Sequence, residues 1–413
     1  MRIAGRLGSP PATVGVAPMP STTERNTSAI DVSEAFEPRF RSASSELARE
    51  VLVHGPVLRS ELSQRLGLSP ATVTRLTKPL LDRGLLVELS ERQDGAMGRP
   101  AKPLDVRIDA RQFMGVKLTG DTAFAVTTDL RANVGRRAER PLPNHELGDV
   151  VEVIAGLANE LASDQAFDAI GISIGGRVSH QRVAARAPFL GWRSVDLGGT
   201  VEARLGVPVT VENDVIALTA AEHWFGLGRG LSNFGVITIG AGVGYGLVVH
   251  DQVVNTVDTG LGLAGHLPLD PTGPLCFLGH RGCSTAMLTI PSIRAQVEVA
   301  IGEPVSYEDI LQLARDDHPV AREVTRATGR ALGRLIATVA DLAMVEQIIL
   351  AGEGLGILSV AGDEMNAEIL VHRDPEANPV RLLVDDSGFP SWARGAAAIA
   401  IQGTFDELAA APQ

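Results

Sequence analysis

The sequence predicts an α/β fold in two lobes, preceded by a smaller module of helices and a short hairpin. The chain has 413 residues, which exceeds the usual size of one domain and favours two or three. Strand-like and helical stretches alternate beyond residue 112, whereas residues 42–107 are mainly helical in pattern. Residues 41–108 also carry 11 Lys and Arg against 8 Asp and Glu, although the whole chain has a net charge of −12. We therefore expect a mildly basic module attached to a strongly acidic body.

Composition excludes several classes of protein. Hydrophobic residues make up 45% of the chain and charged residues 21%, the balance of a globular protein with a real core. No apolar run approaches the roughly 20 residues that cross a bilayer, and Arg2 and Arg6 are not followed by the apolar segment of a secretory signal. Two cysteines argue against a disulfide-framed secreted protein. We expect a cytoplasmic protein with no membrane partner.

Residues 1–40 are rich in Pro, Ser, Thr and Ala and show no apolar period. Such a segment cannot bury enough apolar surface to offset the entropy of ordering its backbone. We predict a disordered tail.

Residues 41–108 show the pattern of a helix-turn-helix. A helix over 42–54 ends at Gly55, and a second ends at Gly67. Ser69 is suited to cap a third helix, with Pro70 at its first position. Val73, Leu76 and Leu80 recur at helical spacing and are expected to face inward, which leaves a polar outer face.

Two short strands around a loop with Gly95 and Gly98 follow this helix and read as a wing, with Arg99 near its tip. A plain packing or dimerisation module is the alternative. The positive charge favours a winged helix-turn-helix that binds a double-stranded DNA operator, because Arg and Lys reach base edges and phosphates and a lone Arg suits a minor groove. The predicted DNA-binding residues are Ser69, Thr72, Thr74, Arg75, Lys78 and Arg99.

Residues 109–413 predict the two-lobed α/β body. Strand-like runs include residues 113–118, 122–130, 168–174 and 208–214, and helical stretches cover 148–163, 215–228 and 325–345. A strand–Gly turn–strand hairpin spans 233–254. Because a hairpin opens each half, the order of elements indicates a duplicated actin-like fold rather than a Rossmann sheet.

The body resembles the ROK family (repressor, open reading frame, kinase). The stretches that carry the resemblance are "GISIGGRVS", "APFLGW", "PVTVEND", "ITIGAGVGYG", "GHLPLDPTGPLCFLGHRGC" and "GAAAIA". With the preceding module they cover most of residues 42–402. The resemblance implies the ribonuclease H-like fold of ATPases and sugar kinases. Members with a winged helix are typically regulators that respond to a sugar or sugar phosphate, and members without it are typically ATP-dependent sugar kinases.

The resemblance implies a phosphate loop of the form GxDxGGT at residues 115–121. Gly115 and Gly120 match it, whereas Lys117, Thr119 and Asp121 replace Asp, Gly and Thr. The change at Lys117 removes an oxygen ligand for a metal ion. Thr119 adds a Cβ where the backbone approaches phosphate, and Asp121 adds a repelling charge.

A second phosphate loop, "GAGVGYG", keeps its glycines but has Ala241 where a hydroxyl is usual, and those glycines also suit a plain hairpin. In the family, the residues matching Asn213 and Asp214 bind sugar hydroxyls and supply the catalytic base. The two side chains equally suit a helix cap. We predict that kinase activity is lost and that the chain is not an enzyme.

The implied sugar pocket is also altered. Leu263 and Thr285 stand where the family has glutamates, and Phe189 replaces a usual Asn. Carboxylates that accept paired hydroxyl bonds are therefore missing. Asn213, Asp214 and His266 remain as predicted ligand-binding residues, for a sugar-like or other small effector, and an empty pocket is the alternative.

The resemblance also implies a zinc site of one His and three Cys. His266, Cys276 and Cys283 occupy three of the four places and Leu278 the last, while His280 lies close enough to substitute. Without a metal, the cysteines would be small packing residues. No cofactor other than zinc is predicted.

Taken together, the sequence predicts a ROK transcriptional regulator, a repressor acting as a homo-oligomer (dimer or tetramer) on paired half-sites. A sugar kinase with a vestigial module is the first alternative. A constitutive DNA-binding or scaffold protein without an effector is the second.

Overall fold

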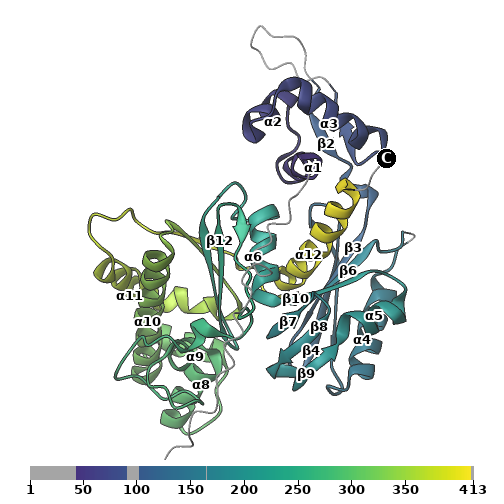
Figure 1. Cartoon of the computed structure of the whole chain (residues 1–413). Helices are drawn as coiled ribbons and strands as arrows, with labels where there is room; N and C mark the ends of the chain where they lie inside the picture. Colours follow the sequence, from purple (N-terminus) through teal and green to yellow (C-terminus); the bar gives the residue numbers. More distant parts are fainter. Residues whose placement is uncertain (1–42, 91–101, 164, 411–413) are drawn as a thin grey trace, which may run out of the picture. The chain divides into compact units, whose positions relative to one another are not determined.

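The computed structural model describes residues 43–90, 102–163 and 165–410, which belong to one compact unit, Arg41–Gln413 (Figure 1). The N-terminal module contains three helices and a two-stranded antiparallel sheet. These elements are α1 (Ala43–His54), α2 (Arg59–Leu66), α3 (Pro70–Asp82), β1 (Leu86–Glu88) and β2 (Leu104–Val106). Gly67 ends α2 in the left-handed conformation at φ 63°, as glycine permits at low cost. The expected helix-turn-helix and hairpin are both confirmed.

The first lobe is built on a five-stranded sheet in the order β10-β6-β3-β4-β5. Its strands are β3 (Phe113–Leu118), β4 (Thr122–Thr128), β5 (Val134–Pro141), β6 (Ala169–Ile174) and β10 (Val209–Asn213). A smaller sheet contains β7 (Arg177–Ser179), β8 (Val183–Ala187) and β9 (Trp192–Asp196). The helical elements are η2 (Ile108–Ala110), α4 (Leu147–Leu161), η3 (Pro188–Leu190) and α5 (Leu197–Leu205).

The second lobe is built on another five-stranded sheet, in the order β13-β12-β11-β14-β15. Its strands are β11 (Phe234–Ile239), β12 (Val243–Val249), β13 (Gln252–Val253), β14 (Gln347–Ala351) and β15 (Arg381–Val384). Its helical elements are η4 (Leu263–His266), α7 (Ser284–Leu288), α8 (Ile290–Ile301), α9 (Tyr307–Arg315), α10 (Pro319–Ala343), η5 (Glu353–Ile357) and α11 (Leu358–His372).

The two large sheets repeat one plan. In each, three consecutive strands pair antiparallel, and two later strands extend the sheet in parallel from the first of the three. Parallel strands need crossover connections, and helices supply them. The duplicated, actin-like α/β fold expected from the sequence is therefore present.

Two further helices connect these parts: α6 (Asp214–Phe225) and α12 (Phe389–Ala410). Helix α12 lies directly on the first sheet because that sheet has glycines beneath it. A Cβ added at Gly115 would lie 1.9 Å from Ala393 O, and one added at Gly171 would lie 1.8 Å from Ala396 O. Only glycine permits so close an approach of helix and sheet backbone.

The core of the N-terminal module continues into the body. Leu47, Leu52 and Leu80 of the module share one buried apolar cluster with Ile401 and Phe405 of α12. The β4–β5 turn adds Arg131, whose guanidinium donates to the carbonyls of Val51 and Leu52 and pairs with Asp105. Burial of large apolar side chains on both sides attaches the module to the body through packing. None of the described helices is both long and apolar enough to span a membrane.

Candidate functional site

Helix α3 presents the surface expected of a recognition helix. Ser69 caps it by accepting a hydrogen bond from the amide of Thr72 at 3.1 Å, and Pro70 occupies its first turn. Val73 and Leu80 are fully buried and Leu76 packs against the same cluster. The inward face is therefore as the sequence predicted.

The outward face of α3 holds Thr74, Arg75 and Lys78, all exposed, with Thr72 half-buried. Among the described residues, neither Arg75 nor Lys78 has an ion-pair partner. Exposed cationic side chains without an internal partner are available to phosphates and base edges. Arg99, the wing residue predicted to bind DNA, lies outside the described residues.

In the body, Lys117 on β3 forms an ion pair with Asp214, the first residue of α6. Both side chains are largely buried, at 8% and 15% exposure. The lysine ammonium also lies 5.1 Å from the centre of the Trp392 ring, within the range of a cation–π contact. The side chain at the family's metal-ligand position is therefore bound to the carboxylate at the family's catalytic-base position.

Asn213 is held entirely by the protein. Its side-chain oxygen accepts from the amides of Val215 and Ile216 at 3.0 and 3.1 Å, which caps α6. Its amide nitrogen donates to Gly176 O at 2.9 Å. Asn213 and Asp214 are thus adjacent and internally bonded, and the cap accounts for the bonds of the Asn213 side-chain oxygen.

Of the remaining residues of the implied sugar pocket, Phe189 lies near this pair, whereas Leu263, Thr285 and His266 have no described contact with it. Phe189 is 52% exposed, and its ring lies beside Gly175, where an added Cβ would also approach the Asp214 carboxylate at 3.5 Å. Leu263 is 68% exposed, and Thr285 donates to Gly265 O at 2.6 Å. Among the described contacts, none joins His266 to Asn213 or Asp214. An apolar ring thus stands beside Asp214 in place of a hydrogen-bonding amide.

Side-chain hydrogen bonds hold the first loop, residues 115–121, in its conformation. The Thr119 hydroxyl lies 2.9 Å from both the Asp121 carboxylate and Thr122 O, which share its one proton, and it accepts from the amide of Thr122. His145 Nε2 lies 2.6 Å from Gly120 O. The Asp121 carboxylate adds negative charge in this loop, which opposes binding of phosphate.

In the second loop a carboxylate occupies the glycine turn. Glu353 Oε1 accepts a hydrogen bond from the Ala241 amide at 3.1 Å, and a Cβ added at Gly240 would lie only 2.3 Å from that oxygen. A backbone amide in such a turn readily donates a hydrogen bond to an anion. Here the Glu353 carboxylate already accepts that hydrogen bond. Glu353 also lines a cavity of about 430 Å³ next to Arg294 and Tyr307. Sequence reasoning missed Glu353, because its partner lies 112 residues earlier in the chain.

The zinc-ligand residues expected from the sequence gather in one place. His266, Cys276, His280 and Cys283 each offer a ligand atom, and these atoms lie within 4.8 Å of one another. His266 Nδ1 is 3.7 Å from Cys276 Sγ and 3.6 Å from Cys283 Sγ, and the two imidazole rings are 4.9 Å apart. Leu278, at the usual Cys position, is exposed. Two His and two Cys suit a closed, four-ligand structural zinc site.

The direction of the pKa shift differs among the residues of this cluster. Burial, with the neighbouring His280, lowers the pKa of His266. Burial opposes ionisation of Cys276, but hydrogen bonds from the backbone at Leu278 and His280 lower the pKa of that thiol overall. Burial raises the pKa of Cys283. A thiolate is the form of cysteine that ligates metal, so Cys276 is the better prepared of the two thiols.

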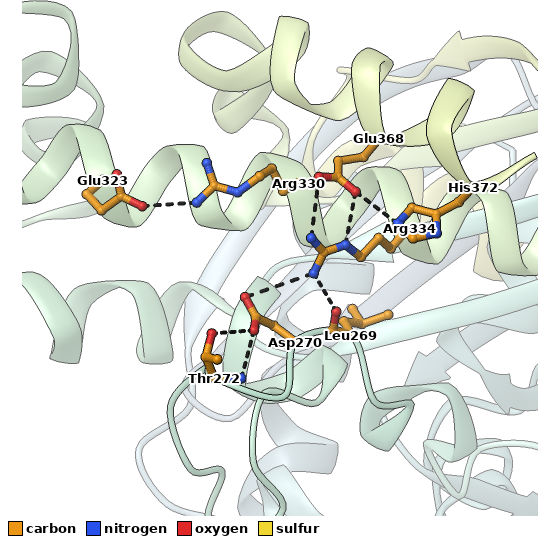
Figure 2. A network of polar contacts seen from close by, with 8 residues as sticks. All are labelled: Leu269, Asp270, Thr272, Glu323, Arg330, Arg334, Glu368 and His372. Atoms are coloured by element: carbon orange, nitrogen blue, oxygen red, sulfur yellow. Dashed lines mark hydrogen bonds and ion pairs between the residues drawn. The ribbon is translucent and has the colours of Figure 1, made fainter.

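The segment that carries these ligands is fastened to α10 and α11 through one arginine (Figure 2). Arg334 donates to Leu269 O at 2.8 Å and forms two hydrogen bonds with the Glu368 carboxylate, while Asp270 lies 4.0 Å away. Asp270 in turn accepts from the amide and hydroxyl of Thr272. A guanidinium shared between a carboxylate and a backbone carbonyl fixes the start of the loop before the cysteines.

Known proteins similar to this chain include both regulators and kinases. The DNA-binding transcriptional repressor Mlc of Escherichia coli is 24% identical over 315 residues, covering 72% of this chain and 77% of Mlc. The crystal structure of a ROK family transcriptional regulator homologous to Mlc superposes with a TM-score of 0.73 at 27% identity, covering 89% of this chain and 96% of that chain.

A ROK family glucokinase from Streptomyces griseus, solved with glucose and AMPPNP, gives a TM-score of 0.61 at 25% identity and covers 71% of this chain and all of that chain. The regulator therefore matches the N-terminal module as well as the body. The family model described as ROK family matches residues 113–403, more than half of the sequence. This chain belongs to the ROK family.

Proposed function

We propose that this chain is a transcriptional repressor that binds operator DNA through its winged helix-turn-helix module and has no kinase activity. One observation carries the proposal: an exposed cationic helix face is attached to a body whose base-position carboxylate, Asp214, is already paired with Lys117. Phosphoryl transfer needs a carboxylate positioned for the attacking hydroxyl and a metal-neutralised phosphate. Lys117 and Glu353 oppose both requirements. The similarity to the solved regulator homologous to Mlc, which covers 89% of this chain, and to Mlc itself over 72% of it supports the same function.

Purified full-length protein tests the proposal through genome-wide DNA footprinting together with a sugar-dependent ATP turnover assay. We expect protection of a small set of sites and no turnover. Asp214→Asn serves as the control, because turnover that this substitution abolishes identifies a kinase. Such turnover, or the absence of any protected site, contradicts the proposal.

The proposed function includes binding of a small-molecule effector. Asn213, Asp214 and His266 are the polar residues retained for a sugar-like or other small effector, and we propose that the protein acts in the cytoplasm as a homo-oligomer. A screen of sugars, sugar phosphates and amino sugars by thermal shift tests the effector. A reproducible shift excludes the alternative of a constitutive DNA-binding protein with an empty pocket.

We further propose that His266, Cys276, His280 and Cys283 hold one zinc ion. The four donors match the ligand types that zinc selects, and with all four places filled by protein the ion would be structural. Its contribution would be to hold the loop from Pro268 to Cys283 in place.

A further inference from the structure

Helix α6 is buried on all sides and touches both lobes. Nine of its twelve residues are buried, which is typical of a helix in the interior of a fold rather than at its surface. On one side, a Cβ added at Gly395 of α12 would lie 2.9 Å from the backbone of Ala217. On the other, one added at Gly246 of β12 would lie 2.0 Å from the Thr219 hydroxyl. A helix packed this tightly moves as a rigid element.

The first turn of α6 is held by the ion pair already described. Asp214 accepts from Lys117 of β3, and Lys117 also faces the Trp392 ring at the start of α12. An ion pair this deeply buried depends on both partners, because removal of one leaves an uncompensated charge. A ligand that takes Asp214 or Lys117 as its own partner therefore removes one of two attachments at the start of α6, the other being the Asn213 cap.

The last turn of α6 touches the DNA-binding module. Trp224 is buried in the apolar cluster that contains Leu47 and Leu52 of α1, and the guanidinium of Arg49 lies 5.9 Å from the centre of its ring. Arg394 of α12 donates to Phe225 O at 2.7 Å. Next to it, His223 lies 3.8 Å from Asp251 of the second lobe. Burial lowers the pKa of His223 to about 4, with the positive charge of Arg49 acting in the same direction.

We propose that α6 is the element through which the Lys117–Asp214 ion pair controls the DNA-binding module. Release of the pair lets the first turn of α6 shift, and the displacement reaches α1 through Trp224 and Arg49. Twelve residues of helix span about 18 Å, so the ion pair and the module are coupled without direct contact. Helix α12 is the fixed reference, because Gly115 and Gly171 place its backbone directly on the first sheet. This inference rests on the proposed DNA-binding function.

Amide hydrogen exchange tests the coupling without any DNA. The variant Lys117→Met with Asp214→Asn removes both charges together, so that no unpaired buried charge is created. We expect faster exchange in α6 and in α1, and unchanged exchange in α4, a helix of the first lobe. The matched control is Arg326→Met with Glu364→Gln, which removes an ion pair between α10 and α11 and should leave α1 unchanged. Changes confined to the neighbourhood of residues 117 and 214 overturn the proposal.

A double-mutant cycle on operator affinity tests the route. Arg49→Met is combined with the Lys117→Met, Asp214→Asn change, and binding is measured on the duplex recovered by footprinting. Distant, independent sites combine multiplicatively to within about twofold. We expect the combined variant to depart from the product of the separate effects by more than about threefold. In the control cycle Arg83→Met replaces Arg49→Met, because Arg83 contacts Leu408 of α12, and the effects should multiply.

The outcomes separate the coupling from the proposed function. Multiplicative effects in both cycles, with a wild-type protein that binds its duplex, overturn the role of α6 and leave the repressor function intact. If footprinting recovers no duplex, the proposed function is contradicted. Amide hydrogen exchange in α1 then still decides whether α6 couples the Lys117–Asp214 ion pair to the DNA-binding module.

Discussion

At the scale of single residues, the positions expected to serve a nucleotide or sugar are bonded internally. Lys117 neutralises Asp214, and Glu353 uses the amide of Ala241. Buried polar groups require partners, and a ligand would have to replace these partners with bonds at least as good. At Asp214 and at the Ala241 amide, the partner that a ligand would supply is therefore already supplied by the protein itself.

Glu353→Ala should allow ATP with Mg²⁺ to bind more tightly. The substitution frees the Ala241 amide and removes a charge that, at about 4 Å from a phosphate, opposes binding by up to roughly 4 kcal/mol at an effective dielectric constant of about 20. We expect an increase of at least about tenfold in affinity by isothermal titration calorimetry. The control is Glu308→Ala, which removes a carboxylate from the same cavity. An equal gain in the control would show a general charge effect rather than occupation of the glycine turn.

A second prediction at this scale concerns the proposed zinc ligand His280. His280→Ala should lower zinc affinity by more than about 100-fold, since loss of a ligand costs more than loss of a supporting hydrogen bond. Adding Leu278→Cys to that variant should restore the affinity, because it returns a thiolate at the family's usual position. Competition with a chromophoric chelator measures both. Equal zinc affinity in the wild type and the His280→Ala variant would exclude His280 as a ligand.

At the scale of elements, the sequence predicts what depends on local pattern. Ser69, Pro70 and the spacing of Val73 and Leu80 placed α3 correctly, because caps and helical periodicity are local signals. The small sheet β7-β8-β9 was not predicted from the sequence, since only parts of its strands fall within the stretches that resemble the family. The pairing of Lys117 with Asp214 joins residues 97 apart, and no local pattern reports such a contact.

Helix α3 carries its own prediction. Arg75→Ala should reduce operator affinity by about 1–3 kcal/mol and relax the sequence preference at one position, as expected for a side chain that reads a base edge. Arg99→Ala, at the predicted wing position, should weaken binding with less effect on the core motif. Selection of binding sequences from a randomised duplex pool measures both effects. If neither affinity nor preference changes in either variant, the winged-helix assignment fails.

At the scale of the whole molecule, the proposed homo-oligomer would place two copies of the chain on one operator. A two-fold dimer presents two identical modules, so its operator should contain two half-sites separated by one helical turn, about 10–10.5 base pairs, or a multiple.

Inserting five base pairs between the half-sites should therefore lower affinity by about 100-fold, because it rotates one half-site to the opposite face of the duplex. Inserting ten should restore much of the affinity, since the half-sites face the same side again. Gel-shift titration of the three duplexes gives the affinities, and sedimentation of the complex gives the number of chains bound. Equal affinity for all three duplexes, with one chain per half-site, would mean that single chains bind independently and that the oligomer plays no part in recognition.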